Sequence, residues 1–97
     1  MIIAKPCVTM KGIVVSGYSW DRQVKVDLAK TAGCLRERGY TVKKLIPEMM
    51  LILEMEGYEV SVYPSGKIIV KLLEDPKKGE SIAGRIYDCA GVLEVVS

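Results

Sequence analysis

The side chains that most often carry out chemistry in proteins are scarce in this sequence. Histidine, the commonest general base, is absent from all 97 residues. The three cysteines, Cys7, Cys34 and Cys89, are widely spaced and form no Cys-x-x-Cys pair, whereas structural zinc sites draw on cysteine and histidine at short spacings. No glycine-rich loop fits a phosphate-binding template. The sequence therefore predicts no catalytic residue, no metal and no cofactor, and indicates a protein that is not an enzyme.

Two of the cysteines, Cys34 and Cys89, lie among apolar neighbours in segments that we expect to be helical. A cysteine in such a place behaves as a small core residue. A nucleophilic cysteine needs a base or a cationic setting, and Arg36 near Cys34 is a weaker indication than the apolar stripe. We expect all three thiols to be reduced, as in a cytosolic protein.

Lysine and arginine side chains are the candidates for a nucleic-acid site. The net charge is only +2, and proteins that bind by neutralising phosphates usually carry a larger basic excess. Charge can still be segregated on one face, so a solvated helix face and a phosphate-binding surface both remain open. The candidate nucleic-acid residues are Arg22, Lys25, Arg36, Lys43, Lys44, Lys77, Lys78 and Arg85.

Length and composition set the frame for these side chains. A chain of 97 residues, with 49% hydrophobic and 27% charged residues, is typical of one globular domain spanning residues 1–97. No apolar run approaches the roughly 20 residues that cross a bilayer. The first residues lack the pattern of a secretion signal. We expect a cytoplasmic protein that does not bind membranes.

The first half of the chain predicts a strand, a helix and a second strand. The β-branched run Cys7–Ser16 predicts a strand with a bulge at Lys11-Gly12. Apolar residues at helical spacing predict a helix over Asp21–Arg38, capped by Ser19 or Asp21. Tyr40–Ile46 follows as a short strand.

The second half contains the clearest pattern in the sequence. Two alternating segments, Tyr58–Tyr63 and Lys67–Leu73, flank Pro64-Ser65-Gly66 and predict a hairpin. Glu48–Glu56 fits either a strand or a short helix, and we interpret it as a strand because a hairpin follows.

The chain closes with a second helix. Asp75 and Pro76 are typical of a helix start, and Gly91 of a helix end. The tail Val92–Val96 can pair as a strand. The predicted fold class is α+β, an antiparallel sheet of about five strands with two helices on one face. The opposite face of the sheet is then left for solvent or a partner.

This order of elements resembles a single repeat of the TATA-box-binding protein (TBP) fold. The local similarity runs from Pro47-Glu48 through Pro64-Ser65-Gly66-Lys67 to the last helix. The family is similar in having a Pro-Glu before one strand and a Ser-Gly-Lys turn between the next two. The resemblance covers nearly the whole chain as topology and about twenty residues as sequence. It implies a TBP-like fold and, for the family, binding of DNA.

The departures from the family weigh against DNA as the ligand. The family uses two repeats and phenylalanine wedges in the minor groove, whereas this chain has one repeat and no phenylalanine. Strand alternation also predicts Glu54, Glu56 and Glu59 beside Lys71 on the open sheet face. Carboxylates beside phosphates repel each other, so the resemblance implies the fold more than the function.

Alternation on the hairpin predicts an apolar patch on that face. The candidate partner-binding residues are Met50, Ile52, Tyr63, Ile69, Lys71 and Leu73. Exposed apolar patches usually mark partner sites. Two alternatives are a register shifted by one residue and a C-terminal tail that covers the patch.

Three functional hypotheses follow. The first is a non-enzymatic binding module that uses the open sheet face, by self-association as a dimer or by docking on another protein. The second is nucleic-acid binding through the basic residues named above. The third is a ligand carrier or enzyme with a pocket between helix and sheet. Trp20 fits either the rim of the core or a stacking platform for bases.

Overall fold

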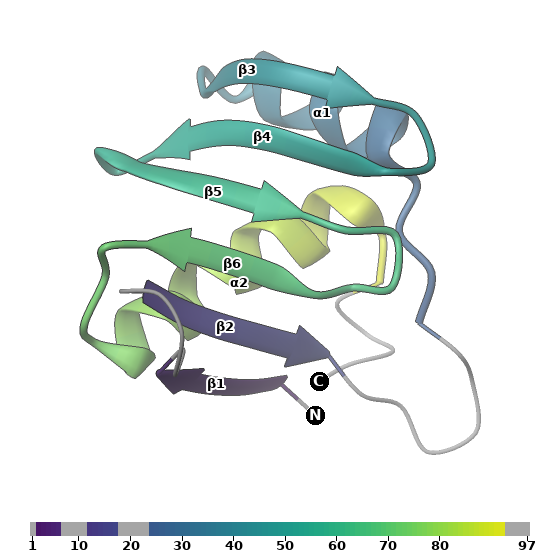
Figure 1. The fold of residues 1–97 in the computed structure, drawn as a ribbon. Helices are drawn as coiled ribbons and strands as arrows, with labels where there is room; N and C mark the ends of the chain where they lie inside the picture. The colour runs from purple at the N-terminus through teal and green to yellow at the C-terminus, as the bar shows by residue number, and fades with distance from the viewer. Residues whose placement is uncertain (1, 7–11, 18–23, 93–97) are drawn as a thin grey trace.

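The computed structural model describes residues 2–6, 12–17 and 24–92. Figure 1 shows the chain as one sheet with helices behind it. In chain order the elements are β1 (Ile2–Pro6), β2 (Gly12–Gly17), α1 (Leu28–Glu37), β3 (Thr41–Ile46), β4 (Met50–Met55), β5 (Tyr58–Val62), β6 (Ile68–Lys71) and α2 (Pro76–Ala90).

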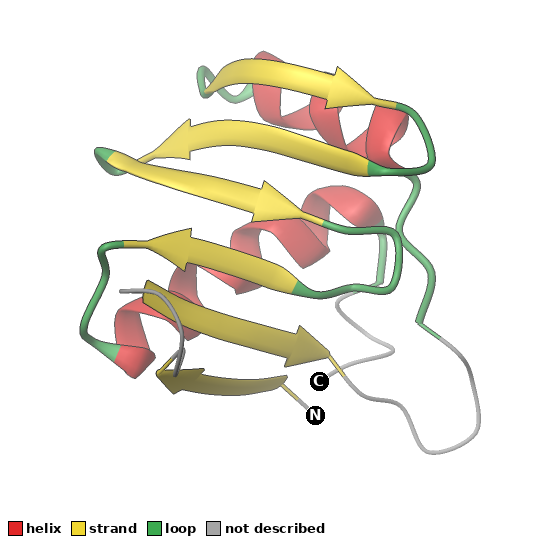
Figure 2. Ribbon diagram, in the orientation of Figure 1, coloured by secondary structure: helices red, strands yellow, loops and turns green. Residues whose placement is uncertain are grey.

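Within the described residues, the strands form a single sheet of six strands in the order β1-β2-β6-β5-β4-β3, and every neighbouring pair is antiparallel. Both helices lie on the same face of the sheet (Figure 2). The predicted α+β class is therefore confirmed, with one strand more than expected. The additional strand is β1, which pairs with β2.

The first predicted strand is confirmed where the chain is described. The described part of Cys7–Ser16 lies in β2, which runs from Gly12 to Gly17. Residues 7–11, with Cys7 and Lys11, lie outside the described residues, as do Ser19, Trp20 and Asp21.

The helix predicted from Asp21 begins only at Leu28. Asp27 is its N-cap, and the Asp27 side chain accepts a hydrogen bond from the Lys30 amide at 3.1 Å. Just upstream of the cap, residues 24–26 form no regular element; Val24 and Val26 are buried, and the Val26 amide bonds to the Pro64 carbonyl at 2.8 Å. Val24, the first residue of the apolar stripe, therefore packs on the core outside the helix, whereas Leu28, Ala32 and Leu35 belong to α1 as predicted.

The hairpin and the second helix agree with the sequence. Glu48–Glu56 contains strand β4, as predicted, and the next hairpin turns at Pro64-Ser65-Gly66. Gly66 has φ +91°, a conformation that favours glycine. Asp75 caps α2, whose first residue is Pro76, and Gly91 ends it in the left-handed region.

The core lies between the sheet and the helices. The sheet contributes side chains that are almost fully inaccessible, among them Leu53, Val60 and Val70. Helix α2 contributes Tyr87, whose hydroxyl donates to the Gly66 carbonyl at 2.5 Å. This bond ties the hairpin turn to the helix layer.

A disulfide links the two helices and corrects the prediction of reduced thiols. Cys34 of α1 is bonded to Cys89 of α2, with their Cα atoms 5.5 Å apart and 55 positions apart in sequence. Arg38 and Asp88 form an ion pair at 2.8 Å between the same two helices. The apolar stripes placed both cysteines in the helices, but they did not predict that the two helices would face each other. Within the described chain, neither helix is long and apolar enough to cross a membrane.

Candidate functional site

The face of the sheet turned away from α1 and α2 is the candidate site, and we call it the open face (Figure 1). Alternation along the strands decides which residues lie there. On β2, Ile13 and Val15 are buried under the helices, so Val14 and Ser16 lie on the open face. On β4, Leu51 and Leu53 are buried, so Met50, Ile52 and Glu54 lie there.

The register aligns several of these residues into a row across the sheet. Val14 pairs with Ile69, Ile69 with Ser61, Ser61 with Ile52, and Ile52 with Lys44. We call the first four residues the apolar row. Ile69, Ile52 and Val14 are half-buried, and Ser61 beneath them is only 5% exposed.

A second group of apolar side chains lies beside this row. Met50 pairs with Ile46, and Tyr63 follows the last residue of β5 on the same face. All three are half-buried. The partly buried side chains that pack against the core are other residues, such as Ala4, Val42 and Leu45. The apolar character of the open face is therefore not explained by packing on the core.

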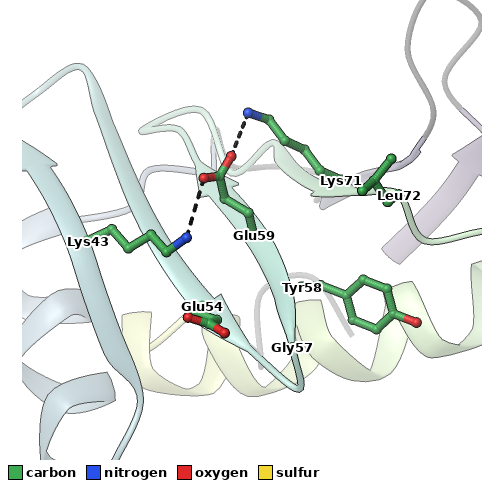
Figure 3. Close-up of a pocket in the computed structure, with 7 residues that line it drawn as sticks. All are labelled: Lys43, Glu54, Gly57, Tyr58, Glu59, Lys71 and Leu72. Atoms are coloured by element: carbon green, nitrogen blue, oxygen red, sulfur yellow. Dashed lines mark ion pairs between the residues drawn. The ribbon is translucent and has the colours of Figure 1, made fainter.

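The register places charged side chains beside the apolar row, on the side away from Met50 and Tyr63. Figure 3 shows these charged side chains. The Glu59 carboxylate lies 2.5 Å from the Lys71 ammonium and 3.7 Å from that of Lys43. Glu54 is the direct cross-strand neighbour of Glu59. We call Lys43, Glu54, Glu59 and Lys71 the charged row. It lines a hollow of about 610 Å³ together with Gly57, Tyr58 and Leu72.

The two lysines offset the repulsion between the two carboxylates. The Lys71 ammonium, by hydrogen bond and by charge, and more weakly Lys43, lower the pKa of the Glu59 carboxyl below its usual value. Glu59 is therefore ionised at neutral pH, and the charged row is balanced between acid and base.

Two residues predicted on the open face lie elsewhere. Leu73 is only 3% exposed and belongs to the core, because Leu72 before it adopts φ +64° and reverses the alternation. Leu72 itself is 71% exposed. Glu56 also leaves the face, since it sits in a turn with φ +53° and pairs with Arg85 of α2 at 3.5 Å.

The other predicted partner residues lie where the alternation put them. Met50, Ile52, Tyr63, Ile69 and Lys71 are brought together on the open face. Lys43 in the charged row was missed as a member of this site. Its strand has a register shift between Val42 and Lys44, and a bulge of this kind defeats simple alternation.

The candidate nucleic-acid residues do not gather on one surface. Lys43 and Lys44 lie on the open face at β3, whereas Lys25, Arg36, Lys77, Lys78 and Arg85 belong to the helix layer or the segment leading into it. Arg22 lies outside the described residues. Several of these cations already have partners, such as Glu59 for Lys43, and the Tyr58 ring at 5.3 Å for Lys78.

Among residues 2–6, 12–17 and 24–92, no group of three or more acidic, cysteine or histidine side chains could hold a metal ion. Comparisons with protein-family models, with curated proteins and with solved structures found no significant match.

Proposed function

We propose that this chain is a non-enzymatic binding module whose open face is covered by a protein partner. The observation that carries the proposal is the apolar row. In an antiparallel sheet with one face in water, the water-facing positions are usually polar. Here Val14, Ile52 and Ile69 occupy those positions at the centre of the sheet.

The combination of apolar and balanced charged groups supports a protein as the ligand. Burial of apolar surface contributes roughly 25 cal/mol per Å², and a border of charges gives specificity. Glu54 and Glu59 would face the phosphates of a nucleic acid bound on the same face, and repulsion would weaken that complex. The cations are also divided between the two layers of the molecule, which disfavours a single phosphate-binding surface.

The resemblance to a TBP repeat concerns the fold and not the ligand. A single TBP-like repeat, with two helices on one side of the sheet, leaves the other side free for a ligand. We propose that this chain uses the same side of the sheet as that family, but for a protein.

The disulfide bears on the location of the protein. Disulfides are rare in the cytosol of mesophiles, but they are common in intracellular proteins of hyperthermophiles. The cytoplasmic location that we propose is thus compatible with Cys34–Cys89 only in a cell whose cytoplasm tolerates disulfides.

A photo-crosslinking amino acid at Ile69 tests the proposal, and the same group at Lys77 of α2 is the control. We expect a protein adduct from position 69, and none from position 77, in extracts of the native cell. An excess of unlabelled wild-type protein should reduce the yield of this adduct, whereas an excess of the Ile69→Lys variant should not. Equal adducts from both positions, or equal competition by Ile69→Lys, would contradict the proposal. Oligonucleotide binding that weakens steeply with salt would favour the nucleic-acid alternative.

A further inference from the structure

The open face is complementary to itself, and from this we infer that its partner is a second copy of the same chain. The inference rests on the proposed function and adds the identity and geometry of the partner. Most homo-oligomers of proteins are two-fold dimers in which the same patch meets itself. Whether a patch fits this arrangement can be read from the positions of its residues.

The sheet has a natural centre for such a two-fold axis. The strand order β1-β2-β6-β5-β4-β3 has its midpoint between β6 and β5. A two-fold axis parallel to the strands at this midpoint stacks two sheets face to face. It places β6 against β5 of the second copy, and β2 against β4 of the second copy. Positions along the strands do not change, so the apolar row faces the second copy's apolar row and the charged row faces the second copy's charged row.

This arrangement matches charges on the two central strands, β5 and β6. Lys71 of β6 comes opposite Glu59 of the second copy, and Glu59 comes opposite the second copy's Lys71. Within one chain these two side chains are already 2.5 Å apart. The two pairs together form a ring in which each carboxylate has an ammonium on either side. Alternating charges of this kind favour one register over others.

The apolar row also meets its counterpart. Val14 comes opposite Ile52 of the second copy, and Ile69 comes opposite Ser61, the short side chain between two larger neighbours. Large against small is the pattern by which packed layers interdigitate. Lys5 and Lys44 come together at the rim, where their long side chains can extend into water.

The alternative two-fold axis, parallel to the rows, is disfavoured. It would turn the charged row onto the side of the face that carries Met50 and Tyr63. Glu59 and Lys71 would then be covered by apolar groups, and burial of charges without new partners is costly. Stacked sheets also rotate by about 30° relative to each other. That rotation moves the central residues least, so the Ile69–Ser61 contact, in the apolar row, is the best-determined part of the interface.

The size of the face indicates a weak dimer. Six strands of about five residues cover roughly 400 Å² in projection, from strand spacings of about 4.8 Å and rises of about 3.4 Å. Standard interfaces bury about 800 Å² of accessible surface on each partner. A face of this size is at the small end of the range of protein–protein interfaces, so the dimer should be detected only at high protein concentration.

Analytical ultracentrifugation of the full chain, from micromolar to millimolar concentration, tests the inference. We expect the mass to rise from that of the 10.7 kDa chain to twice that value. Lys71→Glu alone and Glu59→Lys alone should each dimerise about tenfold more weakly, because like charges would meet across the axis. An equimolar mixture of the two variants should recover a dimer at least as tight as the wild type. The exposed pair Lys77→Glu and Glu80→Lys on α2 is the matched control, and should change nothing alone or mixed.

A chain that carries both Glu59→Lys and Lys71→Glu keeps its internal ion pair, and therefore tests the axis without a change in folding. It should dimerise with itself and should not pair with labelled wild type. A wild-type chain that stays monomeric throughout, or a double variant that pairs freely with wild type, overturns the inference. The chain could stay monomeric in ultracentrifugation and yet crosslink from position 69 to a different protein, with unlabelled wild-type protein preventing that crosslink. This result would overturn the inference of a dimer and leave the proposed function intact.

Discussion

The two faces of this sheet are built from the same strands but follow different rules. On the covered face, Leu53, Val60 and Val70 are completely inaccessible and pack against the helices. On the open face, Ile52 and Ile69 are equally apolar but only half-buried. The covered face is explained by folding alone. The open face is not, and the difference between the faces is the main indication that this protein binds something.

Neighbouring residues on β6 allow the sharpest test of that difference. Val70→Lys places a charge in the core and should destabilise the fold by about 4 kcal/mol or more. Ile69→Lys, one residue earlier but on the open face, should change the free energy of unfolding by less than about 1 kcal/mol. Urea denaturation monitored by circular dichroism measures both.

The same two variants distinguish residues needed for folding from residues needed for self-association. Ile69→Lys should remain folded and lose self-association. If Ile69→Lys unfolds as readily as Val70→Lys, the open face is part of the core, and the comparison between the faces fails.

The second-largest effect is expected from the disulfide that links α1 and α2 on the covered face. Replacement of Cys34 and Cys89 by alanine should lower the free energy of unfolding by about 2–4 kcal/mol, because the disulfide restricts the unfolded chain across 55 positions. A reductant should have the same effect on the wild type and no effect on the double variant. Equal stability with and without reductant would show that this bond contributes nothing.

The hairpin turn at the end of β5 should be less sensitive. Gly66→Val should cost about 1–3 kcal/mol, because φ is +91° and a Cβ would lie 2.9 Å from Val24 Cγ1. Gly57→Val is the control, since Gly57 also has positive φ but has nothing within 4 Å of a Cβ. Thermal unfolding should give a smaller loss for Gly57→Val, and equal losses would mean that the contact with Val24 is unimportant.

The smallest expected effect belongs to the charged row. The Glu59 pKa is lower in the folded chain than its ordinary value of 4.5. The carboxylate thus stabilises the fold fully above that pH, and this contribution is lost as the pH falls through the folded-state pKa. Unfolding midpoints measured from pH 7 down to pH 2 should fall less steeply for Glu59→Gln than for wild type. Parallel curves would show that the ion pair with Lys71 is too exposed to matter.

Local patterns predicted much of this structure because their causes are local. The hairpin around Gly66 and the helix between Asp75 and Gly91 depend on residues within a few positions of each other. The strand alternation that placed Met50, Ile52 and Ile69 on one face is equally local. These elements could therefore be predicted from sequence.

The errors have long-range or conformational causes. Val24 fits the helical spacing of Leu28, Ala32 and Leu35, but it packs ahead of the helix because the nearby Val26 amide bonds to the Pro64 carbonyl, far along the chain. Leu73 was misplaced because a single left-handed residue, Leu72, shifts the alternation by one. The disulfide joins two helices that four strands separate in sequence, and these helices meet only when the sheet has formed. The periodicity of apolar residues within a single segment predicts none of these three features.

The irregular pairing of β3 affects whether further strands can add to the edge of the sheet. β3 is an edge strand, and the shift between Val42 and Lys44 interrupts its ladder beside two consecutive lysines. Bulges and lysines on an edge discourage the addition of further strands. At the other edge, β1 ends with Pro6, which has no amide hydrogen to donate. Growth along the hydrogen-bonding direction, which leads to fibres, is disfavoured at both edges. Face-to-face stacking therefore gives a closed pair, and its mass should reach a plateau as concentration rises.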